Sequence, residues 1–497
     1  MSINVQNKEF PLNRLIEASG GKPNFDTEGV VVRGLTADSR AVGPADLFFA
    51  LIGDSVDGHS FVAEAMECGA AAAVVERIID PEARLVIVPD TRLAMAVMAK
   101  EFFGKPDEDI AVVGITGTNG KTTCTYMMRD IGTAAKEPFG VMGTLGYVIG
   151  ESVQKLDFTT PDPIALFRVL AEMRDTGLRG VAMEISSHGL AQKRSWGIDY
   201  DVIAFTCLTQ DHLDYHGDME SYFDAKASLF ESIKPEVASV INIDDAYGRR
   251  LLDRTNSLQT ITYGIREKAD IRATEIRTGT DSVEFVVTAS EDEADIRVAT
   301  AGLFNVYNSL CSIGIGLALG YPLEAIAKGL TNFCGVAGRL ERIEGSHNFS
   351  IYVDYSHTPD ALYHALNACR DIASGRVIVV FGAGGDRDKN KRPKMGRVAG
   401  ELADIVVLTS DNPRTEAPSK IIDEIEAGVP QSAEKYRIDD RKKAIEYALE
   451  LAKAGDVVLI AGKGHEDYQI IGKVKRHFDD REIVREWLSR YGYRREN

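Results

Sequence analysis

The sequence has only six cysteines among 497 residues, and none of them stands in a C-x-x-C pair. Pairs at that spacing would indicate a zinc ribbon, so this class of metal site is not expected. Scattered single cysteines also do not form the disulfide framework of a small secreted domain, and a reducing cytoplasm fits them best. They are Cys68, Cys124, Cys207, Cys311, Cys334 and Cys369.

Long apolar runs are also missing. No stretch approaches the roughly 18 consecutive apolar residues that a membrane-spanning helix needs. The first segment, "MSINVQNKEFPLNRLIEASGG", lacks the apolar core of a signal peptide. We therefore expect a soluble cytoplasmic protein without membrane insertion.

Positive charge is in deficit as well. Lys and Arg number 57 against 75 Asp and Glu, which gives a formal net charge of -18. A broad basic face for nucleic acid is not expected at this balance. A polyanionic ligand would instead need local cationic groups.

The composition that remains is that of an ordinary globular chain, with 44% hydrophobic and 27% charged residues. At roughly 150 residues per domain, the length predicts about three domains, each long enough to bury its own core. Low-complexity tracts and obvious repeats are absent from the sequence.

Short β-like runs such as "DLFFAL" and "AAAVVE" alternate with helical stretches such as "SFVAEAMECGA". This alternation predicts an α/β fold. The charged, proline-containing stretch "KEFFGKPDEDI" predicts a domain boundary near residue 107, and the stretch "CGVAGRLERIEG" predicts another near residue 338. The expected domains are residues 1–107, 108–338 and 339–497.

The second and third expected domains contain apolar runs typical of buried parallel strands. In the second domain they are "IAVVGIT", "GVAMEISS", "VIAFTCL" and "VASVIN", followed by an apolar helix with a capped start in "GLFNVYNSLCSIGIGLALG". In the third they are "SIYVDY", "RVIVVFGAGG", "DIVVLTSDNP" and "DVVLIAGKG". Loops at the carboxyl ends of parallel strands are where such sheets bind ligands.

The loop "GITGTNGKTTC", residues 114–124, is the strongest single motif. It departs from the Walker A pattern, because Ile115 occupies the position of the first glycine. A strand, small residues and then Lys121 and Thr122 at a helix start nevertheless offer backbone N–H groups, a helix dipole and a cation to one anion. Lys121 would reach the β/γ phosphates and Thr122 would face Mg²⁺. The alternative is a glycine-rich turn without a ligand.

Glu184 is an acidic residue at the end of the apolar run "GVAMEISS". A buried carboxylate is costly unless it is paired or bound to a metal. In P-loop proteins an acid at a neighbouring strand end holds Mg²⁺, and Glu184 fits that position. Taken alone, it could equally be a salt-bridged or exposed strand end.

The stretch "TQDHLDYHGDMESYFDAKASLF" gathers several titratable side chains. His212 and His216 have the i, i+4 spacing of a zinc helix, but Leu213 stands where the HExxH motif has its glutamate, so a metalloprotease has no base here. Lys226, by itself, would be a solvated residue on a helix face.

These motifs together resemble the Mur ligase family of peptidoglycan synthesis. The stretches "GTNGKTT", "EISSHGLAQKR", "DHLDYHG" followed by "AK", "GLFNVYN", "GR", "VDYSHTPD" and "SDNPR" occur in this order and span almost the whole chain. The resemblance implies a central P-loop mononucleotide-binding domain. An N-terminal α/β uridine-nucleotide domain and a C-terminal Rossmann-like domain would flank it.

The resemblance implies an ATP-dependent amide ligation. ATP would phosphorylate the D-glutamate γ-carboxylate of UDP-N-acetylmuramoyl-L-alanyl-D-glutamate, and the amine of meso-2,6-diaminopimelate would attack the acyl phosphate. Two Mg²⁺ ions are expected, because phosphoryl transfer depends on charge neutralisation. The partners would be these three small molecules, and the protein would act as a monomer.

Four alternatives stay open. The chain could be a sister ligase that adds L-lysine, a ligase of another step or a folate polyglutamate synthase that uses the same core. It could also be a P-loop ATPase that binds without ligating. The "DNPR" stretch and the N-terminal "ADSR" stretch favour the diaminopimelate-adding ligase over the sister enzymes.

Position by position, the resemblance implies a catalytic centre at Lys121, Glu184, His212 and Lys226. The metal ligands would be Thr122, Glu184, His212 and Lys226, the last as N6-carboxylysine, because carbamylation by CO₂ turns its cation into an anionic oxygen ligand. The ATP contacts would be Gly117, Thr118, Asn119, Gly120, Lys121, Thr122, Thr123, Asn305, Asn308, Arg339 and Asp354. Asn305 and Asn308 could instead simply cap a helix.

The resemblance also implies a site for the UDP-muramyl-dipeptide, and Phe158 beside it stands where some relatives have asparagine. That site would comprise Ala37, Ser39, Asp54, Thr159, Thr160, Ser186, Gln192 and Arg194. Because Arg339 and Asp354 come from the third domain, ATP would lie between domains, and closure of the third domain would complete the site.

The amino-acid site would comprise Arg387, Asp411, Asn412, Pro413, Arg414, Gly462 and Glu466. Arg414 offers a planar fork suited to a carboxylate. Diaminopimelate has a second carboxylate at its far end and lysine does not, so lysine would leave the Arg414 cation desolvated without a partner. The plainer alternatives are a solvated basic loop for Arg387 and a surface acid for Glu466.

Overall fold

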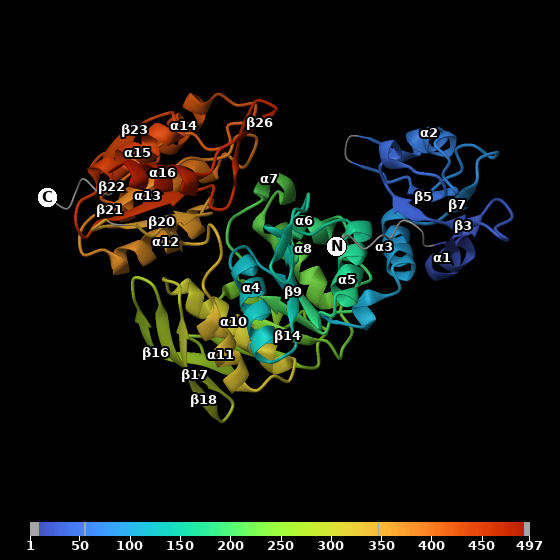
Figure 1. Cartoon of the computed structure of the whole chain (residues 1–497), viewed down its shortest axis with the longest axis horizontal. Helices are drawn as coiled ribbons and strands as arrows, with labels where there is room; N and C mark the ends of the chain where they lie inside the picture. The colour runs from blue at the N-terminus through green and yellow to red at the C-terminus, as the bar shows by residue number, and fades with distance from the viewer. Residues whose placement is uncertain (1–8, 54–55, 346, 492–497) are drawn as a thin grey trace.

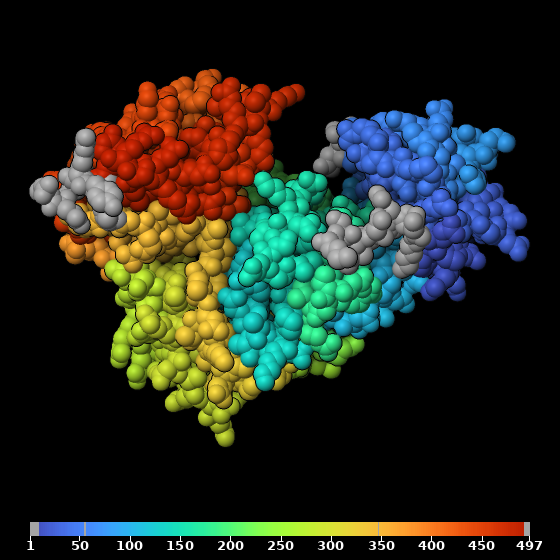
Figure 2. Space-filling view, viewed as in Figure 1, coloured from blue at the N-terminus to red at the C-terminus, as the bar shows by residue number. Residues whose placement is uncertain are grey.

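Three α/β domains follow one another along the chain in the computed structural model, which describes residues 9–53, 56–345 and 347–491. In Figure 1 the N-terminal domain is blue, the central domain runs from cyan to yellow and the C-terminal domain is orange to red. Figure 2 shows the C-terminal domain lying against the central domain, whereas an open notch separates it from the N-terminal domain. The predicted α/β class in three domains is confirmed.

The N-terminal domain is built on a five-stranded sheet in the order β2-β7-β6-β5-β4. Strands β4 to β7 are parallel, and β2 pairs antiparallel with β7. Its elements are β1 (Phe10–Pro11), α1 (Leu12–Ser19), β2 (Lys22–Pro23), β3 (Val31–Val32), β4 (Gly34–Thr36), β5 (Asp46–Phe49), α2 (Val62–Glu67), β6 (Ala72–Val75), β7 (Leu85–Ile87) and α3 (Thr91–Phe102).

Helix α3 joins the N-terminal domain to helix α5 (Pro163–Asp175) of the central domain. Met98 of α3 and Leu170 of α5 are fully buried in one apolar cluster that continues across the domain boundary. The ammonium of Lys100 lies 2.7 Å from Asp107 Oδ2 and 2.6 Å from Asp199 Oδ2. These contacts attach the N-terminal domain to the side of the central domain.

The central domain has an eleven-stranded sheet in the order β11-β10-β9-β12-β8-β13-β14-β15-β16-β17-β18. Its middle part, from β9 to β16, is parallel, and both edges are antiparallel. Its strands are β8 (Ala111–Thr116), β9 (Phe139–Gly143), β10 (Gly146–Ile149), β11 (Ser152–Gln154), β12 (Gly180–Glu184), β13 (Val202–Phe205), β14 (Ala238–Asn242), β15 (Thr260–Gly264), β16 (Ile271–Thr278), β17 (Val283–Ala289) and β18 (Asp292–Val298).

Helices cover both faces of this parallel part, which explains why its strands are apolar throughout. Val113 of β8 faces α4 and α10, whereas Val112 of the same strand faces the layer that contains α5 and α8. The helices are α4 (Lys121–Ala134), α5, α6 (Ser187–Ala191), α7 (Leu213–His216), α8 (Met219–Ser232), α9 (Ala246–Leu251), α10 (Phe304–Ala318) and α11 (Leu323–Asn332).

The C-terminal domain has a six-stranded sheet in the order β19-β20-β24-β21-β22-β23, parallel except for β19. Helices α12 to α14 pack on one face and α15 and α16 on the other. The elements are β19 (Glu341–Arg342), β20 (Ser350–Asp354), α12 (Pro359–Ile372), β21 (Val377–Phe381), α13 (Lys391–Leu402), β22 (Ile405–Leu408), α14 (Pro418–Glu426), β23 (Glu434–Arg437), α15 (Arg441–Leu451), β24 (Val457–Ala461), β25 (Tyr468–Ile471), β26 (Val474–His477) and α16 (Asp480–Tyr491).

The apolar runs named from the sequence form β8, β12, β13 and β14 in the central domain and β20, β21, β22 and β24 in the C-terminal domain. All eight are parallel strands, as predicted. Parallel neighbours end at the same edge of a sheet, so each domain collects its polar loops at one edge. The capped start expected for α10 is wrong, because Leu303 at its N-cap makes no side-chain hydrogen bond to the helix.

None of the helices in the described part of the chain combines the length and the apolar composition that crossing a bilayer requires.

A buried ion pair holds α15 to α16 and generates a stability prediction. Arg441 donates to both carboxylate oxygens of Asp480 at 2.8 and 2.7 Å, and both side chains are fully buried. We expect Asp480→Ala to lower the free energy of unfolding by about 3–5 kcal/mol, because it removes the carboxylate that accepts two hydrogen bonds from a fully buried guanidinium. Chemical denaturation measures this change.

A matched control lies on the same two helices. Glu486 of α16 pairs with Lys442 of α15 at 2.9 Å, but both side chains are largely exposed. Glu486→Ala should therefore change the free energy of unfolding by less than about 1 kcal/mol. Equal effects of the two substitutions would contradict the assignment of the stability to the buried pair.

Candidate functional site

A cavity of about 470 Å³ lies where the carboxyl edge of the central sheet meets the C-terminal domain. Its walls come from the glycine-rich loop, from the ends of β12, β13 and β14, and from the first turns of α10 and α12. The cavity therefore brings together the polar strand ends of two domains.

The glycine-rich loop forms the floor of this cavity between β8 and α4. Gly117 and Gly120 have φ angles of 143° and 88°, where other residues are strained. A Cβ on Gly117 would lie 1.9 Å from Thr206 Oγ1, so the close approach also requires glycine. Ile115, the residue that breaks the Walker A pattern, is fully buried inside strand β8. The glycines required by the turn thus begin after the strand, at Gly117.

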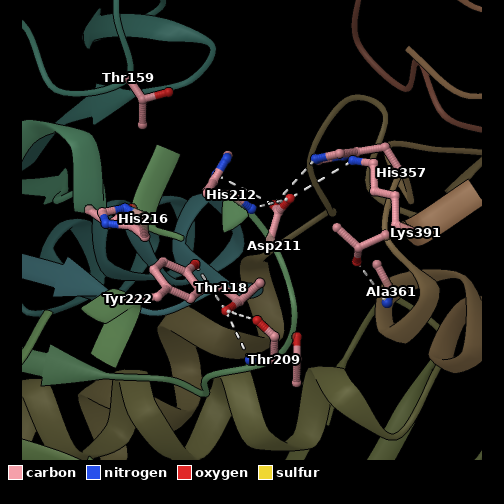
Figure 3. A network of polar contacts seen from close by, with 12 residues as sticks. Thr118, Thr159, Thr209, Asp211, His212, His216, Tyr222, His357, Ala361 and Lys391 are labelled. Carbon is pink, nitrogen blue, oxygen red and sulfur yellow. Dashed lines mark hydrogen bonds and ion pairs between the residues drawn. The ribbon is translucent and has the colours of Figure 1, made fainter. Parts of the chain in front are cut away.

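Lys121 begins helix α4, and its ammonium folds back over the loop. Nζ donates to Gly117 O and Thr118 O, each at 2.8 Å. Burial lowers the pKa of Lys121. Thr118 in turn bonds to Thr209 and to the hydroxyl of Tyr222, which ties the loop to the segment after β13 (Figure 3).

Glu184, at the end of β12, is 2% exposed. Its Oε1 accepts from Thr122 Oγ1 at 2.9 Å and from the Thr144 N–H at 2.8 Å. The interpretation as an exposed or salt-bridged strand end is wrong, because uncharged donors hold this carboxylate in the interior. Arg339 reaches Thr122 Oγ1 from the C-terminal side at 2.9 Å, so one threonine hydroxyl links the loop, β12 and Arg339.

Lys226 of α8 is 1% exposed, so its interpretation as a solvated face residue is wrong. Its Nζ donates to Gly117 O at 2.9 Å and to Thr116 Oγ1 at 3.4 Å. Nζ also lies 4.9 Å from the ring centroid of Tyr222. Burial holds the pKa of Lys226 well below its ordinary value.

The two histidines at i, i+4 do not share a helix. His212 has a left-handed φ of 55° and precedes α7, and His216 ends it with its Nε2 2.9 Å from Ser187 Oγ. Burial lowers the pKa of His212 to about 3 and that of His216 to about 4. Within the described residues, no three His, Cys, Asp or Glu side chains form a group able to hold a metal by themselves.

Asp211 connects the central and C-terminal domains, and its importance was not apparent from the sequence. In Figure 3 its carboxylate lies between His212 and two residues of the C-terminal domain, at 3.4 Å from His212 Nε2, 3.6 Å from His357 Nε2 and 3.8 Å from Lys391 Nζ. Burial alone would raise the pKa of Asp211, but the hydrogen bond from His357 and the surrounding positive charge hold it well below its ordinary value.

A second contact between these domains lies at the other end of the loop. Asn119 Nδ2 donates to Asp360 Oδ2 of α12 at 3.0 Å. Asp360 and Asp211 were not predicted as site residues, because a single acid in a sequence carries no signal of its partner. The adjacency of Asp211 to His212 in "DHLDYHG" was the available clue.

Asn305 and Asn308 lie on one face of α10 beside the loop. Asn308 Nδ2 donates to Asn305 Oδ1 at 3.0 Å, and Asn305 Nδ2 donates to Ala301 O at 2.7 Å. Asp354, at the end of β20, accepts from the Leu340 N–H at 2.6 Å, and it lines the same cavity.

The residues expected to hold the dipeptide end of the substrate lie together beside Glu184. Thr160 Oγ1 donates to Glu184 O at 2.9 Å and lies 3.1 Å from Ser186 Oγ. Arg194 donates to Thr160 O at 3.1 Å and to Gln192 Oε1 at 2.6 Å. Thr159 Oγ1 lies 3.2 Å from Thr144 Oγ1.

Phe158, the departure noted in the sequence, supports this group. The guanidinium of Arg194 lies 4.0 Å from the ring centroid of Phe158, a distance at which cation–π attraction operates. Ser39 is buried in the separate N-terminal domain and Ala37 is exposed there. Asp54, also expected at the uridine end, lies outside the described residues.

The residues expected to hold the amino acid lie in loops after β21, β22 and β24. Glu466 is mostly buried and accepts from Asn412 Nδ2 at 2.8 Å and from Lys463 Nζ at 3.0 Å, so its interpretation as a surface acid is wrong. Arg414 is partly buried, whereas Arg387 is exposed. Asp411, Asn412, Pro413 and Gly462 are buried around them.

In these features a P-loop nucleotide domain faces a Rossmann-like domain across a shared cavity. This arrangement defines a class of enzyme. Three family models match the chain. The model described as "Mur ligase family, catalytic domain" matches residues 31–103, "Mur ligase middle domain" matches residues 115–316, and "Mur ligase, glutamate ligase domain" matches residues 338–464. The chain belongs to the Mur ligase family. The expected enzyme class, an ATP-dependent ligase of this family, is confirmed.

Individual relatives agree with this membership. A Geobacillus thermodenitrificans protein called UDP-N-acetylmuramoyl-L-alanyl-D-glutamate--2,6-diaminopimelate ligase is 44% identical over 474 residues, which are 94% of this chain and 95% of the relative. A solved structure with the same enzyme name has a TM-score of 0.70 and 32% identity, over 96% of this chain and 98% of the other. A MurF ligase from Thermotoga maritima, solved with ADP, has a TM-score of 0.64 and 20% identity, over 93% of this chain and 98% of the other. At this low identity the likeness supports the fold and nothing further.

The Asp211 contacts generate a prediction about domain closure. We expect Asp211→Asn to weaken the attraction to His357 and Lys391, because the amide carries no charge. Hydrogen exchange, measured by mass spectrometry, should become faster in residues 355–358 and in the first turn of α13. Asp214→Asn, an exposed neighbour, is the control and should leave exchange there unchanged. Unchanged protection in the Asp211 variant would show that these contacts do not hold the domains.

Proposed function

We propose that this protein ligates meso-2,6-diaminopimelate to the D-glutamate γ-carboxylate of UDP-N-acetylmuramoyl-L-alanyl-D-glutamate, at the expense of ATP, in peptidoglycan synthesis. The observation that carries the proposal is the cavity in which the glycine-rich loop and the C-terminal domain meet, in a chain of this family. The Geobacillus thermodenitrificans relative whose name describes this reaction matches 94% of this chain, and this match supports the choice of reaction. We further propose domain boundaries near residues 107 and 338, and a monomeric cytoplasmic enzyme.

The ATP phosphates would lie on the glycine-rich loop. The backbone of residues 117–120 and the N-terminus of α4 offer N–H groups and the positive end of a helix dipole. Lys121 would exchange its two contacts with loop carbonyls for the β/γ phosphates, and Arg339 would add positive charge from the C-terminal side. Asn305, Asn308 and Asp354 would contact the nucleoside. The remaining loop contacts would be Gly117, Thr118, Asn119, Gly120, Thr122 and Thr123.

The residues beside the loop fit Mg²⁺. This ion prefers oxygen ligands and binds through one or two carboxylates together with substrate phosphates. Thr122 Oγ1 and the buried Glu184 carboxylate, 2.9 Å apart, supply such oxygens. When bound, Mg²⁺ neutralises the charge of the transferring phosphoryl group.

Glu184, His212 and a carbamylated Lys226 would hold a second Mg²⁺ near the acceptor. The uncarbamylated Lys226 is a buried amine near the partly buried Lys121, whose positive charge disfavours a second cation there. Carbamylation converts it into an oxygen donor of opposite charge. The modification thus turns a destabilising group into one that suits a cation.

The acceptor would extend from the N-terminal domain to the catalytic centre. Its uridine end would bind near Ala37, Ser39 and Asp54, and its dipeptide end near the group defined by Thr159, Thr160, Ser186, Gln192 and Arg194. The hydrogen bond from Thr160 to the Glu184 carbonyl joins this pocket to the strand that carries the catalytic carboxylate. The γ-carboxylate would thereby be oriented toward the γ-phosphate, and its phosphorylation gives the acyl phosphate.

The incoming amino acid would bind in the C-terminal loops, with its amine directed at the acyl phosphate. Arg387 and Arg414 would hold carboxylates and Glu466 an ammonium, with Asp411, Asn412, Pro413 and Gly462 shaping the pocket. Lys463 Nζ and Asn412 Nδ2 both donate to Glu466 Oε2, so Oε1, which accepts a 3.4 Å bond from Tyr468, would be the oxygen that meets the substrate ammonium. Closure over the cavity would exclude water, which competes for the acyl phosphate.

The choice of amino acid separates this proposal from the lysine-adding alternative. With ATP, Mg²⁺ and the UDP-muramyl-dipeptide, we expect faster product formation with meso-diaminopimelate than with L-lysine, measured by product mass. Arg414→Ala should raise the KM for diaminopimelate about tenfold or more, because a hydrogen-bonded charged pair contributes about 1.5–3 kcal/mol. Faster turnover with lysine would refute the preference. Phosphate release without both co-substrates would instead support the non-ligating ATPase.

The carbamate is tested separately. Lys226→Ala should lower turnover by up to about 100-fold, the scale seen when support for a metal site is lost. Acetate or formate should restore part of the activity, because a free carboxylate can occupy the space of the carbamate. Lys121→Ala with the same acids is the control and should show no recovery. Full activity of Lys226→Ala without added acid would exclude the carbamate.

A further inference from the structure

A buried ionic cluster ties together the two loops that carry Arg387 and Arg414, and no step proposed above uses it. At its centre is Arg392 of α13, whose side chain is fully buried. It donates to both carboxylate oxygens of Glu416 at 3.0 and 2.8 Å, to Glu424 Oε2 at 2.7 Å and to Gly384 O at 3.2 Å. One guanidinium therefore contacts the loop after β21, the loop after β22 and helix α14.

Glu416 is the member of this cluster that joins the two loops directly. Besides Arg392, its Oε1 accepts from the Asp386 N–H at 2.6 Å, and its Oε2 lies 3.3 Å from Lys389 Nζ. The hydrogen bonds from Arg392 lower the pKa of Glu416 to about 2, so the carboxylate is ionised at neutral pH. Because its oxygens are engaged by Arg392, Lys389 and a backbone N–H, Glu416 does not compete with a substrate carboxylate for Arg387 or Arg414.

The backbone that Glu416 holds is the backbone that orients the two arginines. Arg414 donates to Gly385 O at 2.8 Å, and Arg387 donates to Asp386 O at 2.9 Å. Asp386 and Arg414 both adopt left-handed φ angles, of 53° and 50°, which need external support in residues with side chains. Glu416 supplies that support at the Asp386 N–H.

Two further hydrogen bonds join the same two loops nearer the surface. Thr415 Oγ1 donates to Asp386 Oδ1 at 2.8 Å, and the Gly385 N–H donates to Asn412 O at 2.9 Å. Hydrogen bonds thus join the two loops, and the guanidinium groups of Arg387 and Arg414 bond to the neighbouring carbonyls of Asp386 and Gly385.

We infer that Glu416 is a positioning residue that gives the enzyme its preference for an amino acid with a carboxylate at its far end. The inference rests on the proposed function. A bidentate arginine–carboxylate pair depends on geometry, and a misplacement of about 1 Å is enough to lose much of its benefit. An amino acid that ends in an ammonium alone makes no such pair and does not depend on the separation of the two guanidinium groups.

The test compares Glu416→Gln with Glu424→Gln in the full-length enzyme. Both remove one carboxylate from Arg392, but Glu424 is 41% exposed and lies on α14, away from Asp386. We expect Glu416→Gln to raise the KM for meso-diaminopimelate about tenfold, with little change in kcat, in the KM for ATP or in the KM for L-lysine. Glu424→Gln should leave all four values close to those of the wild type.

Thr415→Val provides a second variant that does not disturb the buried cluster. It removes the exposed bond to Asp386 and should raise the KM for meso-diaminopimelate in the same direction, by a smaller factor. Thermal unfolding of each variant shows whether it is folded. If Glu416→Gln does not fold, the Thr415→Val result decides the inference.

The outcomes are distinct. A selective rise in the KM for meso-diaminopimelate in Glu416→Gln, absent from Glu424→Gln, supports the inference. Equal losses with both amino acids, or equal effects of the two glutamate substitutions, overturn it while the proposed function stands. A wild-type enzyme that prefers L-lysine overturns the proposed function itself, and the selectivity role of Glu416 fails with it.

Discussion

Parallel strands end at one edge of their sheet, and the arrangement of the whole site depends on this constraint. Strands β8, β12, β13 and β14 deliver the glycine-rich loop and Glu184 to one edge of the central sheet. Strands β20, β21, β22 and β24 deliver their own loops to the corresponding edge of the C-terminal sheet. The cavity exists because the two edges face each other, held by Arg339 against Thr122 and by Asp211 against His357.

The cost of buried charge explains how this site is organised. Lys226 and Glu184 are both enclosed by the protein, at 1% and 2% exposure, and neither would be stable there without polar partners. Glu184 receives them from Thr122 and Thr144, whereas Lys226 receives only loop oxygens. Phosphates, cations and a carbamate bound as proposed above would together satisfy both signs of charge.

The sequence predicted the parallel core well, because its strands are continuous apolar runs with a polar residue at the end. It did not predict the antiparallel extension β16 to β18, although the alternating burial along β17 was readable in "VEFVVTA". The surroundings of single charged residues were harder to predict from the sequence. Without the family resemblance, which placed both residues in the site, Lys226 looked like a surface lysine and Glu466 like a surface acid, because an isolated charge in a sequence does not reveal what surrounds it.

The sequence by itself determined the α/β class, the glycine-rich loop and the family, since these depend on local periodicity and on the order of motifs. Only the tertiary structure decided that Asp211 meets Lys391, 180 residues further along the chain, and that Glu416 meets Arg392 and Asp386. Such contacts depend on how two loops are juxtaposed, and no spacing in the sequence encodes that distance. The departure from the Walker A pattern at Ile115 is the converse case, because the burial of Ile115 in β8 explains what the motif alone left open.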